Sequence, residues 1–226
     1  SSQSRELIEE MAQQTELVLV TEPPTGDGSL KTRRKGTAGY TMTITGKAAH
    51  AGNEPEMGIN AVIEFAQQAL DLNQLNDLKN GTSVSVTVVN GGDAANVIPD
   101  NVVARLDVRT VSLQAYEKVH AQIMDRMPFM PGAKVEMTRL SHRPPMERDG
   151  ETFGQAQVIA KNAGITIRED GAGGGSDGNF TAALGIPTLD GLGAEGAGLH
   201  ALNEHILISS LPKKAALMAA IIRDWE

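Results

Sequence analysis

The chain of 226 residues is acidic, with 28 Asp and Glu against 20 Lys and Arg and a formal net charge of -8. This balance argues against nucleic acid as a partner, because phosphate recognition needs a basic face. Cysteine is absent, which excludes a disulfide framework, a zinc-thiolate site and a thiol nucleophile. No apolar run approaches the roughly 20 residues that span a bilayer, so we expect a soluble protein without a membrane partner, cytoplasmic or periplasmic.

Residues 1–35 are predicted to be the end of the first part of an α/β domain. The chain opens on a helix already under way, which indicates a fragment of a longer protein. Leu17–Val20 predicts a strand buried on both faces of a parallel sheet, and two prolines soon end it. The polar stretch that follows carries a basic cluster, which we interpret as a solvated linker. This cluster consists of Lys31, Arg33, Arg34 and Lys35.

Residues 36–146 predict a ferredoxin-like domain with the order β-α-β-β-α-β. Its strands are expected at 39–45, 82–89, 102–109 and 133–140. Its first helix repeats apolar residues at helical spacing, and Ser112 is expected to cap the second helix. The apolar face of the first helix comprises Val62, Ile63, Ala66 and Leu70. Two helices on one face of an antiparallel sheet leave the other face, or an edge strand, for a partner.

Residues 147–226 return to α/β alternation. We expect a helix at 153–162, a strand at 165–168, a glycine-rich turn, a short helix, a strand at 186–189 and a final helix. The inner face of the final helix is predicted to hold Met218, Ile221, Ile222 and Trp225. The predicted fold class is therefore an α/β domain interrupted by an antiparallel α+β insert.

Two side chains stand where zinc ligands could lie. Glu22 directly follows a predicted strand, and ligands gather at the carboxyl ends of strands in open α/β sheets. His200 follows a later strand in a glycine-rich loop, without the H-E-x-x-H motif. Carboxylate and imidazole both bind zinc, but each residue is also compatible with a structural role, and two ligands do not make a site.

The glycine-rich turn allows a second interpretation. Residues 173–178 match G-x-G-x-x-G formally, and Asp190 lies near the end of the next strand, as in a dinucleotide site. The helix after the turn is short and the other mononucleotide units are missing, which counts against this alternative. In the inserted domain, an arginine such as Arg109 can grip a carboxylate or lie at the rim as a surface cation, while His120 is interpreted as a packing or surface residue.

Six motifs in series resemble the di-zinc aminoacylase/carboxypeptidase family of metallopeptidases. They are TEP at Glu22, TGKAAHAGNEPEMGINA at 45–61, GGDAANVIPD at 91–100, ARLDVRT at 104–110, GGGSDG at 173–178 and GLH at 198–200. Within the family they are most similar to the glutamate carboxypeptidases that remove C-terminal glutamate from folates. The resemblance implies a zinc-exopeptidase domain, residues 1–35 and 147–226, interrupted by a ferredoxin-like lid, residues 36–146, that forms a homodimer.

The resemblance also implies roles for individual residues. Glu22 and His200 would be ligands of two different zinc ions. His50 would reach from the lid to the partner subunit's scissile carbonyl and donate to the oxyanion. Contacts to a small-molecule or peptide substrate with a free carboxylate are implied for Asn96, Arg109, Arg143, Gly175 and Ser176.

The motif ligands and the general base of the family's upstream half are absent from these 226 residues. We therefore expect the C-terminal portion of a zinc-dependent carboxypeptidase, acting on a C-terminal amino acid that is expected to be glutamate, and inactive by itself. Deacylation of N-acyl amino acids by the same family remains an alternative. A non-catalytic dimerisation or binding module remains an alternative for this chain alone.

Overall fold

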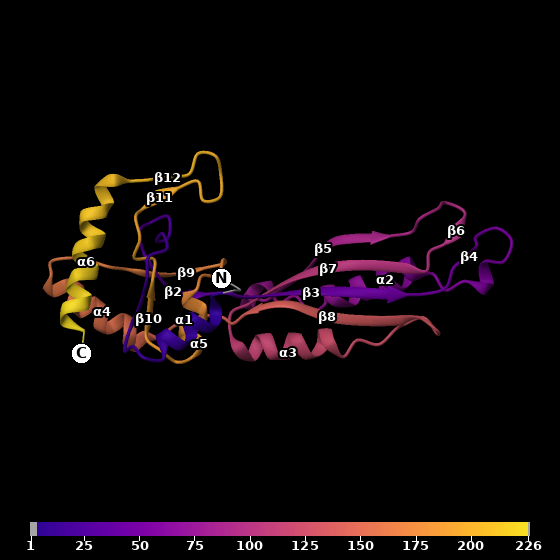
Figure 1. The fold of residues 1–226 in the computed structure, drawn as a ribbon, viewed down its shortest axis with the longest axis horizontal. Coiled ribbons are helices and arrows are strands. Elements are labelled where there is room, and N and C mark those ends of the chain that lie inside the picture. The colour runs from indigo at the N-terminus through magenta and orange to yellow at the C-terminus, as the bar shows by residue number, and fades with distance from the viewer. Residues whose placement is uncertain (1–3, 226) are drawn as a thin grey trace. The chain divides into compact units, whose positions relative to one another are not determined.

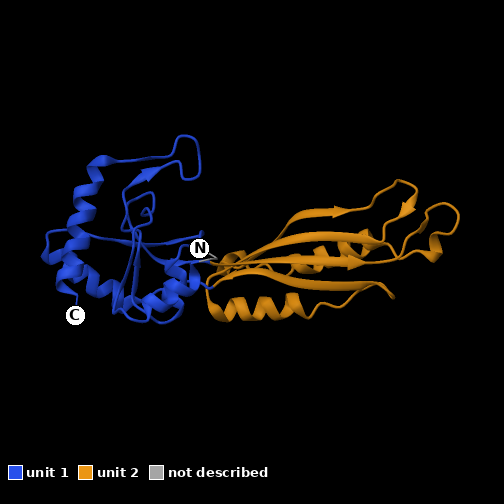
Figure 2. Ribbon diagram, in the orientation of Figure 1, with its two compact units in different colours: residues 1–35, 144–226 blue, residues 36–143 orange. Residues whose placement is uncertain are grey.

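A computed structural model describes residues 4–225 and divides the chain into two compact units (Figure 2). Unit 1 comprises residues 1–35 and 144–226, and unit 2 comprises residues 36–143. The sequence places the second boundary after Met146, but this residue packs in unit 1. It is 2% exposed and exchanges two backbone hydrogen bonds with Arg34, at 2.9 and 3.0 Å. Across residues 4–225, no helix combines the length and apolar character needed to cross a bilayer.

Unit 2 is a four-stranded antiparallel sheet with the strand order β5-β7-β3-β8 (Figure 1). The strands are β3 (Gly36–Thr45), β5 (Ser83–Gly91), β7 (Asn101–Thr110) and β8 (Lys134–Arg143). The helices are α2 (Ala61–Asn73) and α3 (Leu113–Met124), and a small second sheet pairs β4 (Ala49–His50) with β6 (Val97–Ile98). Short 3-10 turns lie at Pro55–Met57 and Leu78–Asn80. The predicted ferredoxin-like order is confirmed.

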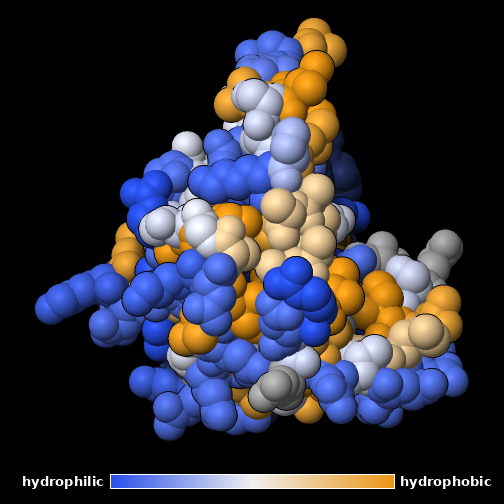
Figure 3. All heavy atoms as spheres, turned by 90° about the vertical axis from the view of Figure 1, so that its left-hand side faces the viewer, coloured by the Kyte–Doolittle hydropathy of each residue, from blue (hydrophilic) through white to orange (hydrophobic). Residues whose placement is uncertain are grey.

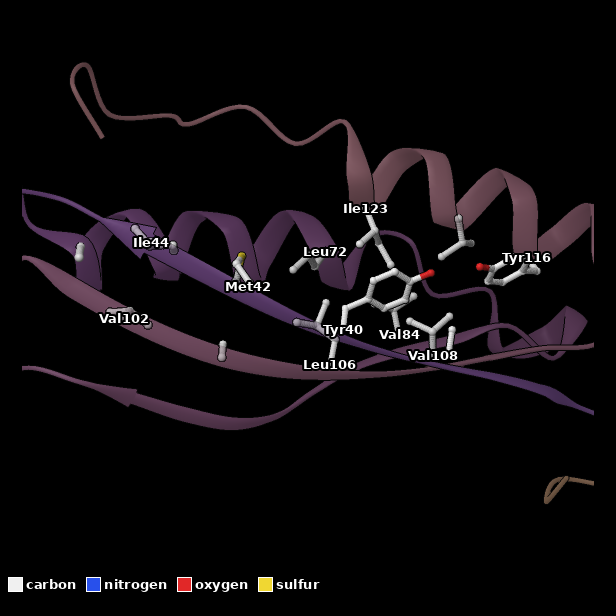
Figure 4. Packing of buried hydrophobic residues seen from close by; sticks show 14 residues of the cluster. Tyr40, Met42, Ile44, Leu72, Val84, Val102, Leu106, Val108, Tyr116 and Ile123 are labelled. Carbon is white, nitrogen blue, oxygen red and sulfur yellow. The ribbon is translucent and has the colours of Figure 1, made fainter. Parts of the chain in front are cut away.

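The core of unit 2 lies between this sheet and the helices (Figure 4). Alternate residues of β3 and β7 point into it, which is the period-two pattern of a strand with one buried face. Tyr40, Met42 and Ile44 from β3 are fully buried against Leu72 of α2 and Ile123 of α3. Ser112 accepts a hydrogen bond from the amide of Ala115, as expected for the N-cap of α3.

The apolar face predicted for α2 does not enter this core. Val62, Ile63 and Leu70 are 39%, 49% and 71% exposed, and the buried polar positions of the helix are Glu64 and Gln68. The spacing predicts the helix correctly, but an apolar stripe shows only that one face is suited to burial, not which surface covers it. In α2 that face remains at the surface of the chain.

Glu64 is buried because it anchors a neighbouring loop. Its carboxylate accepts hydrogen bonds from the amides of Phe129 and Met130, at 2.7 to 3.1 Å, and from the Gln68 side chain at 2.7 Å. The same Gln68 amide donates to the carbonyl of Met127 at 2.8 Å. A buried carboxylate is tolerated when its oxygens are satisfied in this way. These contacts hold the segment that joins α3 to β8.

His120 of α3 belongs to a stack of aromatic rings on the side of the helix that faces the sheet. Its Nδ1 lies 2.9 Å from the hydroxyl of Tyr40, and its ring stacks on Tyr116 at a centroid distance of 5.3 Å. Tyr116 stacks in turn on His142 at 4.0 Å and accepts a hydrogen bond from Arg139. Burial lowers the pKa of His120, with a further contribution from Arg139 and an opposing one from Asp125.

We predict that unit 2 loses stability when the pH falls from about 7 to about 5, because of His120. With its pKa lowered in the folded state, the unfolded chain binds the proton more readily, so the stabilisation is present above the ordinary histidine pKa and is lost below it. Denaturant unfolding at both pH values measures the change. His120→Gln keeps an acceptor for Tyr40 but does not titrate, so it should reduce the loss. An equal loss in both proteins would contradict this prediction.

Unit 1 contains a mixed four-stranded sheet with the order β1-β10-β2-β9. β1 is parallel to β10, β10 is antiparallel to β2, and β2 is parallel to β9. The strands are β1 (Val18–Val20), β2 (Leu30–Arg34), β9 (Glu169–Ala172) and β10 (Thr188–Asp190), with a hairpin of β11 (Gly196–Ala197) and β12 (His205–Ile206). The helices are α1 (Arg5–Ala12), α4 (Gly150–Asn162), α5 (Gly178–Ala183) and α6 (Leu211–Asp224), preceded by a 3-10 turn at Ile208–Ser210. The α/β class is confirmed.

Four details of unit 1 differ from the sequence-based expectation. The predicted polar linker contains β2, an inner strand of the sheet. The segment 165–168 is not a strand, and pairing begins at Glu169. β1 is a half-buried edge strand. Ile222 of α6 is 70% exposed, whereas Ile221 is fully buried.

Candidate functional site

At one end of unit 2, the β4–β6 pair brings His50 and Asn96 together. His50 lies opposite Val97 in the ladder, and the amide of Ala51 donates to the carbonyl of Asn96 over 2.9 Å. Both predicted residues are exposed. They therefore share one small, hydrogen-bonded element that lies beyond the end of β3 (Figure 1).

The imidazole of His50 has a defined environment. Its Nδ1 accepts hydrogen bonds from the amides of Gly52 and Asn53, each at 3.1 Å. The ring also lies against Gly52, where a Cβ would be 3.5 Å from the imidazole Cε1. The side chain is thus held by its own turn although it is exposed to solvent.

Arg109 and Arg143 occupy the other end of the sheet of unit 2. Both are register partners of Thr37, Arg109 from β7 and Arg143 from β8. They share the face turned away from the helices, since Thr37 alternates with buried residues of β3. With strands about 4.8 Å apart, their Cα atoms are separated by roughly 10 Å. Arg109 is held by Asp107 in a bidentate ion pair at 2.7 and 3.0 Å.

These two groups are far apart within unit 2. β7 starts at Asn101, close to the β4–β6 end, and Arg109 lies eight residues farther along the strand. At ~3.3 Å per residue this is about 26 Å. One copy of unit 2 therefore cannot bring His50 and Arg109 to the same small ligand.

In unit 1, the segment after β10 runs beside Glu22. The amide of Leu192 donates to the carbonyl of Val20, and that of Gly193 to the carbonyl of Glu22, at 3.2 and 3.0 Å. A Cβ at Gly193 would lie 2.2 Å from the carbonyl oxygen of Thr21, so only glycine allows this approach. Glu22 is exposed at the carboxyl end of β1. The structure therefore joins the Glu22 strand end to the beginning of the loop that leads to His200.

His200 lies in the loop between β11 and β12. In Figure 3, orange hydrophobic spheres are exposed among blue ones in the protrusion at the top of the view. A φ of 65° makes His200 the non-glycine residue with positive φ within residues 4–225. Its amide donates to the Glu204 carboxylate at 3.3 Å. Left-handed backbone at a residue other than glycine is costly and concentrates at functional positions. The imidazole is exposed.

Glu22 and His200 have the chemistry of zinc ligands, but the described residues do not complete a site. Among residues 4–225, no group of three or more His, Cys, Asp and Glu side chains is arranged to hold a metal ion. A catalytic zinc site needs three protein ligands. The residues present therefore fit part of a zinc site at most.

The glycine-rich turn is supported by a buried polar network that sequence reasoning missed. Arg34 forms a bidentate ion pair with Asp190, at 2.7 and 2.8 Å, and donates to the carbonyl of Gly174 at 2.9 Å. The Ser176 hydroxyl donates to the same Asp190 carboxylate, and Ser176 is 7% exposed. The polar stretch around Arg34 predicts a solvated side chain, and the sequence hints at its burial only through its position four residues after the apolar Leu30.

This network bears on two predictions. Ser176 uses its hydroxyl within the fold, whereas Gly175 is exposed and can offer its backbone. Asp190, the acid that a dinucleotide site would need for a ribose, is completely buried and paired with Arg34. The dinucleotide alternative is therefore not supported by the arrangement of this turn.

Comparison with known proteins gives a consistent result. The M20 peptidase dimerisation domain matches residues 32–129. Carboxypeptidase G2 from Pseudomonas sp. (strain RS-16) is 31% identical over 98% of this chain and 55% of its own length. A succinyl-diaminopimelate desuccinylase from Psychrobacter sp. (strain PRwf-1) is 28% identical over 97% of this chain and 58% of its own. The crystal structure of aminopeptidase PepT from Bacillus cereus matches with a TM-score of 0.76 and 25% identity, over 97% of this chain and 61% of that one.

The chain is similar to M20-family metallopeptidases through both units. The resemblance inferred from the six motifs is thus confirmed. The chain spans little more than half the length of these M20 relatives. Within that span, the M20 dimerisation domain contains β5 and α2 but ends before β8.

Proposed function

We propose that this chain provides the lid and part of the catalytic domain of a zinc-dependent M20 carboxypeptidase that releases a C-terminal glutamate. One observation carries the proposal: the similarity to carboxypeptidase G2 extends over 98% of the chain, through both units. The motifs around Glu22, His50, Asn96, Arg109 and His200 lie within that extent.

The charges of unit 2 support a substrate with a carboxylate. The protein is acidic overall, yet Arg109 and Arg143 flank Thr37 on one face of the sheet. Guanidinium groups bind carboxylates through paired hydrogen bonds. Arg109 is preoriented by Asp107, which lies two residues before it on the same face.

We also propose that residues outside these 226 complete the zinc site. Unit 1 offers Glu22 and His200, and the relatives are nearly twice as long as the stretch they share with this chain. The region around the His200 hairpin exposes large apolar side chains, which are usually covered when a protein is complete. They are Leu199, Leu202, Ile206, Leu207 and Ile208, with exposures from 48% to 110%.

The proposed enzyme is a homodimer that forms through β5 and α2. β5 is an edge strand, and a groove of about 910 Å³ separates it from α2. Leu70 of α2 lines this groove together with Val84 and Val86 of β5. Val62 and Ile63 of α2 and Val88 and Val89 of β5 are also exposed. A second copy would pair with the free strand edge and cover these residues about a two-fold axis. The other edge strand, β8, lies outside the matched dimerisation domain.

Leu70→Glu should therefore weaken the dimer. A two-fold interface loses each contact twice, so two leucine contacts of about 1.5 kcal/mol predict a roughly hundredfold higher dissociation constant. Sedimentation of this chain over a concentration series measures it. Leu140→Glu, at a 56% exposed position on β8, is the matched control and should leave association unchanged. Equal effects of both variants, or a monomeric parent chain, would contradict the proposed interface.

The function itself is tested by zinc analysis and turnover. This chain alone should hold far fewer than two zinc ions per molecule and should not hydrolyse folyl or aminobenzoyl glutamate. A longer form that includes the upstream segment should bind zinc and release glutamate. Failure of the zinc-loaded longer form to release glutamate would overturn the proposed specificity. Two tightly bound zinc ions in this chain would overturn the proposal that its site is incomplete.

A second candidate is an N-succinyl amino acid deacylase, which the 28% identity to a desuccinylase over 97% of the chain favours. Both reactions hydrolyse an amide in a substrate with carboxylates, so the arginine pair suits either. Assay of the longer form with N-succinyl-diaminopimelate beside the glutamate substrates separates them. Hydrolysis of the succinyl substrate alone would select this candidate.

A further inference from the structure

The turn that follows β4 controls the chemistry of the His50 ring. The amides of Gly52 and Asn53 both donate to Nδ1, at 3.1 Å. An amide N–H needs a lone pair to donate into, so Nδ1 carries no proton in this arrangement. A neutral imidazole then has its single ring hydrogen on Nε2.

We propose that the Gly52 and Asn53 amides act as positioning groups that make His50 a hydrogen-bond donor only. The inference rests on the proposed function in one respect, namely that the scissile carbonyl oxygen of a substrate is the acceptor that Nε2–H meets. The acceptor capacity of the ring is already used by its own backbone. The group recognised by His50 must therefore present an acceptor atom, such as a carbonyl oxygen or an anion, to Nε2–H.

This state excludes two other roles for the residue. A metal ligand or a general base would need the lone pair of Nε2, and the ring proton would then have to sit on Nδ1. There it would point at two N–H groups, and both hydrogen bonds would be lost. An exposed histidine without such contacts could exchange its tautomers. It could then serve as a hydrogen-bond donor, a metal ligand or a general base.

The surrounding backbone keeps this arrangement in place. The amide of Ala51 is bound to the carbonyl of Asn96, and the amide of Glu54 donates to the carbonyl of His50 at 3.2 Å. The ring lies beside Gly52, where a Cβ would meet the imidazole Cε1 at 3.5 Å, an ordinary van der Waals contact. The turn is thus fixed on both sides of the two donating amides.

Nitrogen-15 NMR of the His50 ring in this chain, at mildly alkaline pH, tests the proposal. Long-range correlations should show Nδ1 as unprotonated and hydrogen-bonded and Nε2 as protonated, with a smaller share of the other tautomer than in a free peptide of residues 46–56. A protonated Nδ1, or the tautomer ratio of the peptide, would overturn it. Neither result depends on zinc or turnover. The tautomer proposal can therefore fail while the proposed function stands, and the proposed function can fail while the tautomer proposal stands.

Asn53→Pro removes one donating N–H, and Asn53→Ala keeps it. The alanine variant should retain the Nδ1 shift of the parent chain, whereas the proline variant should move it toward that of the peptide. In the longer enzyme, kcat of Asn53→Pro should be roughly tenfold to hundredfold below that of Asn53→Ala with similar KM, by analogy with the loss of partners that orient metal-bound histidines. Equal kcat values in two folded variants with different Nδ1 shifts would overturn the positioning role.

Discussion

His50→Ala in the longer, zinc-loaded enzyme is expected to lower kcat by roughly a hundredfold or more, with a much smaller effect on KM. Such a loss is typical when one donor to a developing oxyanion is removed. His50 is suited to this role because its Nδ1 is occupied by two backbone amides and its exposed ring can donate from Nε2. Steady-state kinetics with a glutamate substrate measure the effect, and unchanged turnover would show that His50 does not contact the reacting group.

The same residue also tests whether the site is shared between two copies. Because Arg109 lies about 26 Å along β7 from the β4–β6 end, we expect His50 to serve the partner's site. Mixing the inactive variants His50→Ala and His200→Ala should then restore activity, since each mixed dimer has one site with both residues intact. Random mixing gives about a quarter of the parent activity. No recovery in mixed dimers would place His50 in the site of its own subunit.

Arg34→Met is expected to lower the free energy of unfolding by about 3–5 kcal/mol, because it leaves a buried carboxylate without its cation. Asp190 is completely buried, and the Arg34 side chain is 4% exposed. The Ser176 hydroxyl would still donate to Asp190, but the paired guanidinium hydrogen bonds would be gone. Denaturant unfolding of the two proteins at neutral pH measures the difference.

The neighbouring residue provides the control for Arg34. Arg33 pairs with Asp170 at 3.1 Å, but these side chains are 56% and 55% exposed. Exposed ion pairs contribute little, so Arg33→Met should change stability by less than about 1 kcal/mol. A double variant, Arg34→Met with Asp190→Leu, should recover part of the loss, since it removes the charge as well as its partner. Equal losses of unfolding free energy for Arg33→Met and Arg34→Met would show that burial of the ion pair does not determine its contribution to stability.

The predicted fold followed from patterns that depend on neighbours in the chain. Alternation in β3 and β7 and the cap at Ser112 are local properties, and they gave the sheet and α3 correctly. Which residues of α2 are buried depends on contacts outside the helix. Its apolar stripe was read correctly, but whether Val62 and Leu70 enter a core depends on surfaces that the helix meets, and Glu64 is buried because a distant loop needs its carboxylate.

The basic cluster at residues 31–35 also shows that burial cannot be predicted from neighbouring residues alone. Lys31 and Arg34 are charged residues in a polar stretch, for which solvent exposure is the ordinary expectation. Arg34 is buried because Asp190, 156 residues later, comes within hydrogen-bond distance in the folded sheet. No spacing in the sequence reveals a pair separated by that distance. The glycine-rich turn was recognised, but its support by Arg34 and Ser176 was not.

The sequence by itself determined the family, the α/β class with its antiparallel insert, and the residue types at the candidate positions, because motifs and periodicity are carried by consecutive residues. The tertiary structure decided which of those residues meet. It joined His50 to Asn96 and Arg109 to Arg143 and separated the two groups along one sheet. It also set which nitrogen of His50 is available, since hydrogen-bond geometry is fixed only when the turn has folded.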